Sequence, residues 1–183
     1  VNDTRVFPAR LIGKRPTGGK IELLLLSQVG STDDGELWRA MGKPRRKLGV
    51  GAIALFPDMT ATVREVEEDS IIVELVAEGS PFTIIEEHGR IPLPPYIRRE
   101  DDREDRKRYQ TVYAGERAQS VAAPTAGLHF TEAVLEDLHA SGHDRVAVTL
   151  HVGPGTFRPI RATNLDEHDM DGEWIEVSES AAG

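Results

Sequence analysis

The stretch QSVAAPTAGLHFTEAVLEDLHASGHDRVAVTLHV, residues 119–152, decides the fold class of the second half of the chain. QSVAAP is typical of a short buried strand, and PTAGLHF follows it as a loop. Thr131 is a suitable N-cap for the helix TEAVLEDLHASG, which Gly142 would end. RVAVTLHV then alternates between apolar residues and others, as in a strand. Strand, helix and strand within some thirty residues predict a βαβ unit, whose two strands run parallel.

Two loops follow the predicted strands, PTAGLHF and GPGTF. Ligands of parallel α/β proteins bind beyond the carboxyl ends of the strands, so neighbouring strands would place both loops on one rim. Glycines there allow close backbone approach, and threonines supply hydroxyl groups. A single loop glycine or histidine is more often structural, but two such loops on one rim favour a pocket. The predicted substrate-binding residues are Pro124, Thr125, Gly127, Phe130, Gly153, Gly155, Thr156 and Phe157.

Three histidines and one glutamate are candidates for acid–base chemistry. His129 and His151 belong to the two loops, and imidazole exchanges protons near neutral pH. His168 and Glu173 lie in DEHDMDGEWIEV, whose carboxylates could instead be solvated loop residues. The spacing there matches no specific metal signature, so we expect no metal site.

The first half of the chain consists of short strands and turns. GKIELLLLSQ is apolar and extended in character, and TATVREVEE and SIIVELV predict a hairpin across residues 67–70. Such strands favour a small all-β barrel or sandwich. Pro92, Pro94 and Pro95 then exclude a helix interior, and RREDDREDRKR, residues 98–108, forms a charged boundary in which a solvated helix is possible.

Composition restricts the function classes. The 183 residues are 39% hydrophobic and 29% charged, with no apolar run of about 20 residues and no cysteine. Disulfides and thiolate nucleophiles are therefore excluded, and a cytoplasmic protein is expected. No GxGxxG, GK[ST], HExxH or GxSxG motif is present.

The net charge of -9 argues against broad nonspecific nucleic-acid binding, although basic residues cluster in two segments. Solvated loops explain these clusters about equally well. The candidate contacts to nucleic-acid phosphates are Lys43, Arg45, Arg46, Lys47, Arg98, Arg99, Arg106 and Arg108.

Six segments in order resemble one family: VNDTRVFPARL, HGRIPLPPYI, YQTVYA, VAAPTAGLHFT, LHVGPGTFRPI and the final H-x-M-x-x-E. The chain is similar to the central part of the S-adenosylmethionine:tRNA ribosyltransferase-isomerases of queuosine biosynthesis, which are longer at both ends. We therefore expect a fragment. The family usually has H-x-M-H-x-E, whereas Asp171 stands where the second histidine is expected. Asp171 must then substitute for it, or the activity is altered.

The resemblance implies an α/β plus β fold, a barrel-like α/β domain with parallel strands into which a small all-β domain is inserted. Residues 1–8 and 109–183 would belong to the larger domain, residues 9–97 to the insertion, and residues 98–108 to the boundary segment.

The resemblance also implies a transferase and isomerase. Family members transfer the ribosyl part of S-adenosylmethionine to an aminomethyl-deazaguanine base at the tRNA wobble position and isomerise it, giving epoxyqueuosine. S-adenosylmethionine is the ribosyl donor and no metal is needed. One of His129, His151, His168 and Glu173 would remove a proton from the ribose carbon on the sulfonium, with the roles among the four left open. The partner would be tRNA, with no membrane, and the protein a monomer.

Two other readings of the sequence remain. One is a non-enzymatic tRNA- or RNA-binding protein in which the β module is a barrel that binds the RNA. The other is an α/β enzyme acting on another nucleoside or a sugar phosphate, with GPGTF as the anion-binding loop.

Overall fold

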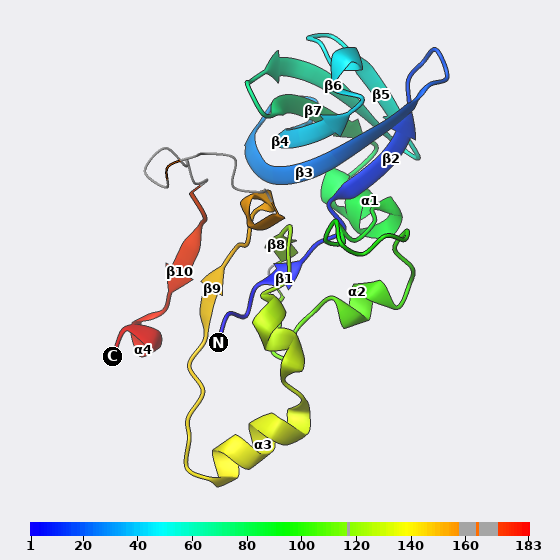
Figure 1. Cartoon of the computed structure of the whole chain (residues 1–183). Coiled ribbons are helices and arrows are strands. Elements are labelled where there is room, and N and C mark those ends of the chain that lie inside the picture. Colours follow the sequence, from blue (N-terminus) through cyan, green and yellow to red (C-terminus); the bar gives the residue numbers. More distant parts are fainter. Residues whose placement is uncertain (117, 158–163, 165–171) are drawn as a thin grey trace. The chain divides into compact units, whose positions relative to one another are not determined.

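The chain divides into two compact units. The computed structural model describes residues 1–116, 118–157, 164 and 172–183 (Figure 1). One unit comprises Pro8–Pro92, and the other comprises Val1–Phe7 with Leu93–Gly183.

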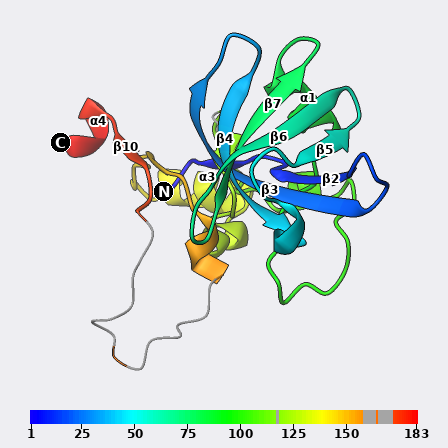
Figure 2. The same ribbon diagram turned by 90° about the horizontal axis from the view of Figure 1, so that it is seen from above.

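The unit Pro8–Pro92 is built on a closed antiparallel barrel, as the short strands and tight turns of the first half predict. Around the barrel the strands follow in the order β2, β3, β4, β7, β6, β5 (Figure 2). Their bounds are β2 Arg10–Lys14, β3 Lys20–Ser31, β4 Glu36–Lys43, β5 Ile53–Phe56, β6 Met59–Val66 and β7 Ile71–Ala77. The predicted hairpin is confirmed, since β6 pairs with β7 and the Glu67 amide donates to the Ser70 carbonyl at 3.0 Å.

Alternation along β3 fills the barrel interior. Ile21, Leu23 and Leu25 are fully buried, while Leu24 and Leu26 on the other face are half-buried. Closure depends on Gly13, where a Cβ atom would lie 2.5 Å from the Leu55 carbonyl oxygen of the adjoining strand. Glycine alone allows β2 and β5 to approach this closely.

The same unit contains helices that the all-β prediction for residues 9–97 did not include. The α-helix α1, Pro81–His88, begins with a proline in its first turn and buries Ile84 and Ile85. A single-turn 3-10 helix, η1, spans Arg45–Lys47. Two turns of helix are too short for the sequence to show a helical period clearly.

The other unit contains a small parallel sheet. Strand β1, Arg5–Val6, pairs in parallel with β8, Ala118–Ser120. Asn2 forms a parallel bridge with Val148 of β9, Val148–Leu150, so β8 and β9 have the expected parallel direction. Among the described residues β8 and β9 share no ladder, because the N-terminal segment pairs with both. The condition that the two strands are neighbours is therefore not met by direct pairing, while their parallel direction is as predicted.

The other unit also contains a third strand pairing and several helices. Strand β10, Ile175–Val177, pairs antiparallel with β9. Helix α3, Glu132–Ala140, has the predicted N-cap, because the Thr131 hydroxyl accepts the Val134 amide at 3.3 Å. The remaining helices are α2 Asp105–Arg108, η2 Thr125–His129, η3 Pro154–Phe157 and α4 Glu179–Ala182. A parallel sheet is thus present, while a barrel-like arrangement of an α/β domain stays a prediction.

Helix α3 leaves most of its apolar residues exposed. Val134 is 42% and Leu138 is 39% exposed, and only Leu135 is half-buried. In the part of the chain that the structure describes, no helix has the length and apolarity needed to cross a membrane.

Candidate functional site

The carboxyl end of β8 meets the residue that follows β9. The amides of Val121 and Ala122 donate to the Val152 carbonyl at 3.1 and 3.2 Å. The buried Ser120 hydroxyl accepts the Val152 amide at 2.9 Å, and it donates to the Ala122 carbonyl at 2.7 Å. These bonds join the starts of the two predicted loops. Convergence of the loops therefore occurs without a ladder between their strands.

His151 is held by two groups from distant parts of the sequence. Its Nδ1 atom lies 2.8 Å from the hydroxyl of Thr4, which is 1% exposed. Its ring stacks on the half-exposed indole of Trp174, with ring centroids 4.7 Å apart and an interplanar angle of 15°. The His151 amide donates to the Trp174 carbonyl at 2.9 Å, which extends the β9–β10 pairing. The imidazole thus has a fixed plane.

Glu173 reaches the GPGTF loop. Its Oε1 atom accepts the Gly153 amide at 2.9 Å, and its side chain is exposed. The antiparallel register places Ile175 opposite Leu150, so the residues preceding Ile175 run alongside those following Leu150. Glu173, a candidate base from the segment DEHDMDGEWIEV, therefore lies beside the GPGTF loop.

The first loop forms η2 and packs directly on the YQTVYA segment. A Cβ atom on Gly127 would overlap the Tyr113 hydroxyl and would lie 2.8 Å from Cγ2 of Thr111. Tyr113 also contacts Phe130 edge to face, with centroids 6.0 Å apart at 68°. Glycine at position 127 is required here by space, since the residue has no positive φ.

A buried tyrosine supports the same segment. Burial raises the pKa of Tyr109 to about 12, although the neighbouring Ala123 backbone opposes the rise. The phenol oxygen itself has no hydrogen-bond partner among the described residues. At physiological pH the phenol is neutral.

The structure places the predicted loop residues as follows. Exposed are Thr125, His129 and Thr156, half-buried are Pro124, Phe130, His151, Gly153 and Gly155, and buried is Gly127. His168, Asp171 and the side chain of Phe157 lie outside the described residues. The hydrogen bonds bring His151, Gly153 and Glu173 together. His129 is the last residue of η2, and no hydrogen bond described above joins it to these three.

Sequence reasoning missed four residues of this region: Thr4, Thr111, Tyr113 and Trp174. Their places depend on contacts across up to 147 positions, as between Thr4 and His151. The signal for Trp174 was its place directly after Glu173, and that for Thr111 and Tyr113 was the YQTVYA segment itself.

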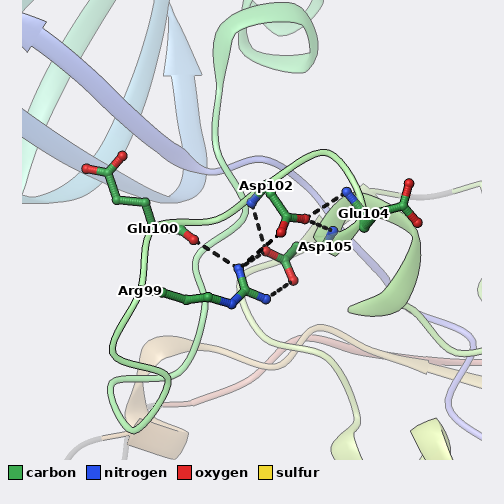
Figure 3. A network of polar contacts seen from close by, with 5 residues as sticks. All are labelled: Arg99, Glu100, Asp102, Glu104 and Asp105. Carbon is green, nitrogen blue, oxygen red and sulfur yellow. Dashed lines mark hydrogen bonds and ion pairs between the residues drawn. The ribbon is translucent and has the colours of Figure 1, made fainter.

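Two of the predicted tRNA contacts are bound within the chain. Arg45 donates to the carbonyls of Glu67, Glu68 and Ser70, with a distance of 2.7 Å to Glu68. Arg99 donates from both terminal nitrogens to the two carboxylate oxygens of Asp105, at 2.6 and 2.7 Å (Figure 3). This pairing holds the pKa of the Asp105 carboxyl below its ordinary value.

Asp105 organises the start of the boundary segment. It is 6% exposed and also accepts the Asp102 amide at 2.8 Å, while Asp102 accepts the amides of Glu104 and Asp105 (Figure 3). The solvated helix considered for residues 98–108 is reduced to α2. Lys43, Arg46 and Lys47 remain exposed on the barrel unit, as does Arg98 on the other. Among the described residues no group of three or more His, Asp or Glu side chains could hold a metal ion.

These features form a candidate ligand site, in which glycine loops converge beyond parallel strands next to a histidine and a carboxylate. The family model described as "Queuosine biosynthesis protein" matches residues 1–183, and the chain belongs to this family.

Curated relatives carry a more specific name. The chain is 51% identical over 184 residues to the S-adenosylmethionine:tRNA ribosyltransferase-isomerase of Anaeromyxobacter sp. (strain Fw109-5), and 52% identical to that of Anaeromyxobacter dehalogenans (strain 2CP-C). Each match covers 99% of this chain and 52% of the relative. The chain thus spans about half the length of the curated relatives it matches.

Proposed function

We propose that this chain forms part of an S-adenosylmethionine:tRNA ribosyltransferase-isomerase. The rim where the loops PTAGLHF and GPGTF meet, in the unit of Val1–Phe7 with Leu93–Gly183, would be part of its S-adenosylmethionine site. One observation supports this most directly: the family's loops PTAGLHF and GPGTF meet through the Val152 carbonyl, and Glu173 bonds to the second loop. A module that only binds RNA has no need for such a site. The proposed substrates are S-adenosylmethionine and a tRNA bearing the aminomethyl-deazaguanine base.

Hydrogen bonding argues that His151 positions the site and does not act as its base. Within the described residues, His151 Nδ1 is the hydrogen-bond partner of the Thr4 hydroxyl, which can donate one proton. Whichever of the two atoms donates, Nδ1 is engaged within the chain, and the ring plane is fixed by the stacking on Trp174. These contacts favour a positioning role for His151.

Glu173 is better placed to accept the proton. One of its oxygens binds the Gly153 amide, and the side chain is otherwise exposed beside the loop. Proton removal from the ribose carbon attached to sulfur leaves a carbanion that the neighbouring sulfonium stabilises. As the ribose ring opens, the carbanion expels adenine, which leaves a vinyl sulfonium; the tRNA amine adds to this electrophile, and methionine leaves when the epoxide forms. Glu173 takes the first proton in this proposal, with exposed His129 as the other accessible candidate.

Turnover measurements on the full-length natural protein test this assignment. Glu173→Gln keeps an oxygen for the Gly153 amide but removes basicity, so we expect a fall in kcat of about 100-fold or more with S-adenosylmethionine binding retained. Glu136→Gln on exposed α3 is the matched control and should behave as wild type. Unchanged kcat in Glu173→Gln, with loss of kcat in His129→Gln, would reverse the assignment.

We further propose that the barrel unit is the inserted domain and that its exposed cations meet tRNA phosphates. Lys43, Arg46 and Lys47 cluster at η1, whereas Arg45 and Arg99 are engaged within the chain. The larger α/β domain would then include the unit carrying the rim. Cytoplasmic location and a monomeric state stay predictions.

A further inference from the structure

A buried hydroxyl lies beneath the η2 loop. Thr111 is 5% exposed, its Oγ1 atom is buried, and the described residues offer this atom no hydrogen-bond partner. Leaving such a group unsatisfied is costly. Buried polar atoms are normally satisfied, so an orphaned one beside a candidate site points to a ligand.

The position of Thr111 is fixed by the loop that packs on it. Its Cγ2 atom faces Gly127, and the buried hydroxyl branches from the same Cβ atom. The Tyr113 hydroxyl also faces Gly127, and the half-buried Tyr113 ring meets the edge of Phe130. The Tyr113 hydroxyl and the Thr111 methyl group therefore lie against Gly127, and the Phe130 ring lies against Tyr113.

The chemistry of this cluster suits a sugar. A hydroxyl group both donates and accepts, which matches the neighbouring hydroxyls of a ribose, and aromatic rings pack on the apolar carbons of a sugar ring. Charged ligands such as phosphate are bound best by cationic donors, and neutral hydroxyls are weaker partners for them. The cluster thus favours a neutral polyol.

We propose that Thr111 and Tyr113 form the floor of the ligand site and bind the ribose hydroxyls of S-adenosylmethionine. This inference rests on the proposed function and assigns the YQTVYA segment, which neither loop contains, to recognition of the sugar. Thr111 and Tyr113 are specificity-determining residues, and Gly127 is needed so that the loop can lie on them.

Calorimetric titration of the full-length natural protein with S-adenosylmethionine tests the floor. Thr111→Val replaces the hydroxyl with a methyl group of similar size, so we expect Kd to rise roughly five- to tenfold while the melting temperature is unchanged or higher. Tyr113→Phe should raise Kd by a similar factor. Thr111→Ser, which keeps the hydroxyl, and Tyr96→Phe at a 72% exposed position are the matched controls and should bind as wild type.

A second titration asks whether the sugar hydroxyls are the groups recognised. Wild type should bind adenosine more tightly than 2′,3′-dideoxyadenosine, and the ratio of the two Kd values should fall toward one in Thr111→Val. An unchanged ratio, or unchanged Kd in both Thr111→Val and Tyr113→Phe, would overturn the floor. Failure of the wild type itself to bind S-adenosylmethionine would instead overturn the proposed function.

Discussion

The barrel unit and the rim-bearing unit differ in how completely each pairs its strand edges and buries its apolar side chains. Every barrel strand has two neighbours, and side chains such as Leu23, Leu25 and Leu75 are fully buried. In the other unit β10 is exposed along its length, and Val134 and Leu138 face solvent. A closed barrel removes strand edges, whereas a short parallel sheet leaves them. The candidate site thus lies in the less self-sufficient unit.

The two tryptophans make this comparison measurable. The chain contains only Trp38, which is buried in the barrel, and Trp174, which stacks on His151. Trp174→Phe leaves a fluorescence reporter for the barrel alone, and Trp38→Phe leaves one for the rim.

The largest effect is expected in the barrel core. Leu75→Ala, at a fully buried position, should lower the free energy of unfolding by about 2–5 kcal/mol in urea titrations followed through Trp38. Leu138→Ala on α3 is the matched change at an exposed leucine and should cost less than about 1 kcal/mol. Equal losses at the two positions would contradict the contrast between the units.

Overpacking of the rim should have the next largest effect. Gly127→Ala places a methyl group against Thr111 and Tyr113, and we expect a loss of about 1–3 kcal/mol together with weaker S-adenosylmethionine binding. Thermal unfolding followed through Trp174 and calorimetry measure the two effects. Gly49→Ala, where no heavy atom of the described residues lies within 4 Å, is the control. Identical behaviour of both variants would show that η2 does not rest on these residues.

Acid should weaken the barrel through its buried carboxylate. The Thr32 hydroxyl and the Arg64 guanidinium hold the pKa of Glu74 below its ordinary value of 4.5. The folded pKa is the lower one, so this stabilisation is present above pH 4.5 and is lost as pH falls through the folded value. In melting curves recorded from pH 7 to pH 3, Glu74→Gln should flatten the acid limb reported by Trp38. An acid limb as steep as that of wild type would exclude Glu74 as a contributor.

The smallest effect concerns the barrel's cations. Arg46→Ala and Lys47→Ala should each reduce the slope of log K against log salt for tRNA binding by about 1, with unchanged melting temperature. Arg45→Ala should instead lower the melting temperature, since Arg45 bonds to the carbonyls of the β6–β7 turn. A larger loss of tRNA affinity in Arg45→Ala than in Arg46→Ala would contradict the division between bound and exposed cations.

Local signals predicted much of each unit. The cap at Thr131, the turn at residues 67–70 and the extended character of the segment that forms β3 depend on neighbours in sequence, and the structure has all three. The all-β prediction missed α1 because eight residues show too little periodicity. The sequence also could not show that β8 and β9 do not pair directly. The N-terminal segment, which pairs with both, is more than a hundred residues away from them in the sequence.

The sequence by itself determined the family, the strand-rich first half, the βαβ order of the second, and the two glycine loops. Those features are carried by residue types and short spacings. Only the tertiary structure decided that the strands close into a barrel, that Thr4 and Trp174 hold His151, that Glu173 reaches Gly153, and that Arg45 and Arg99 are engaged within the chain. These contacts join residues that chain folding alone brings together, and no local pattern encodes which partners meet.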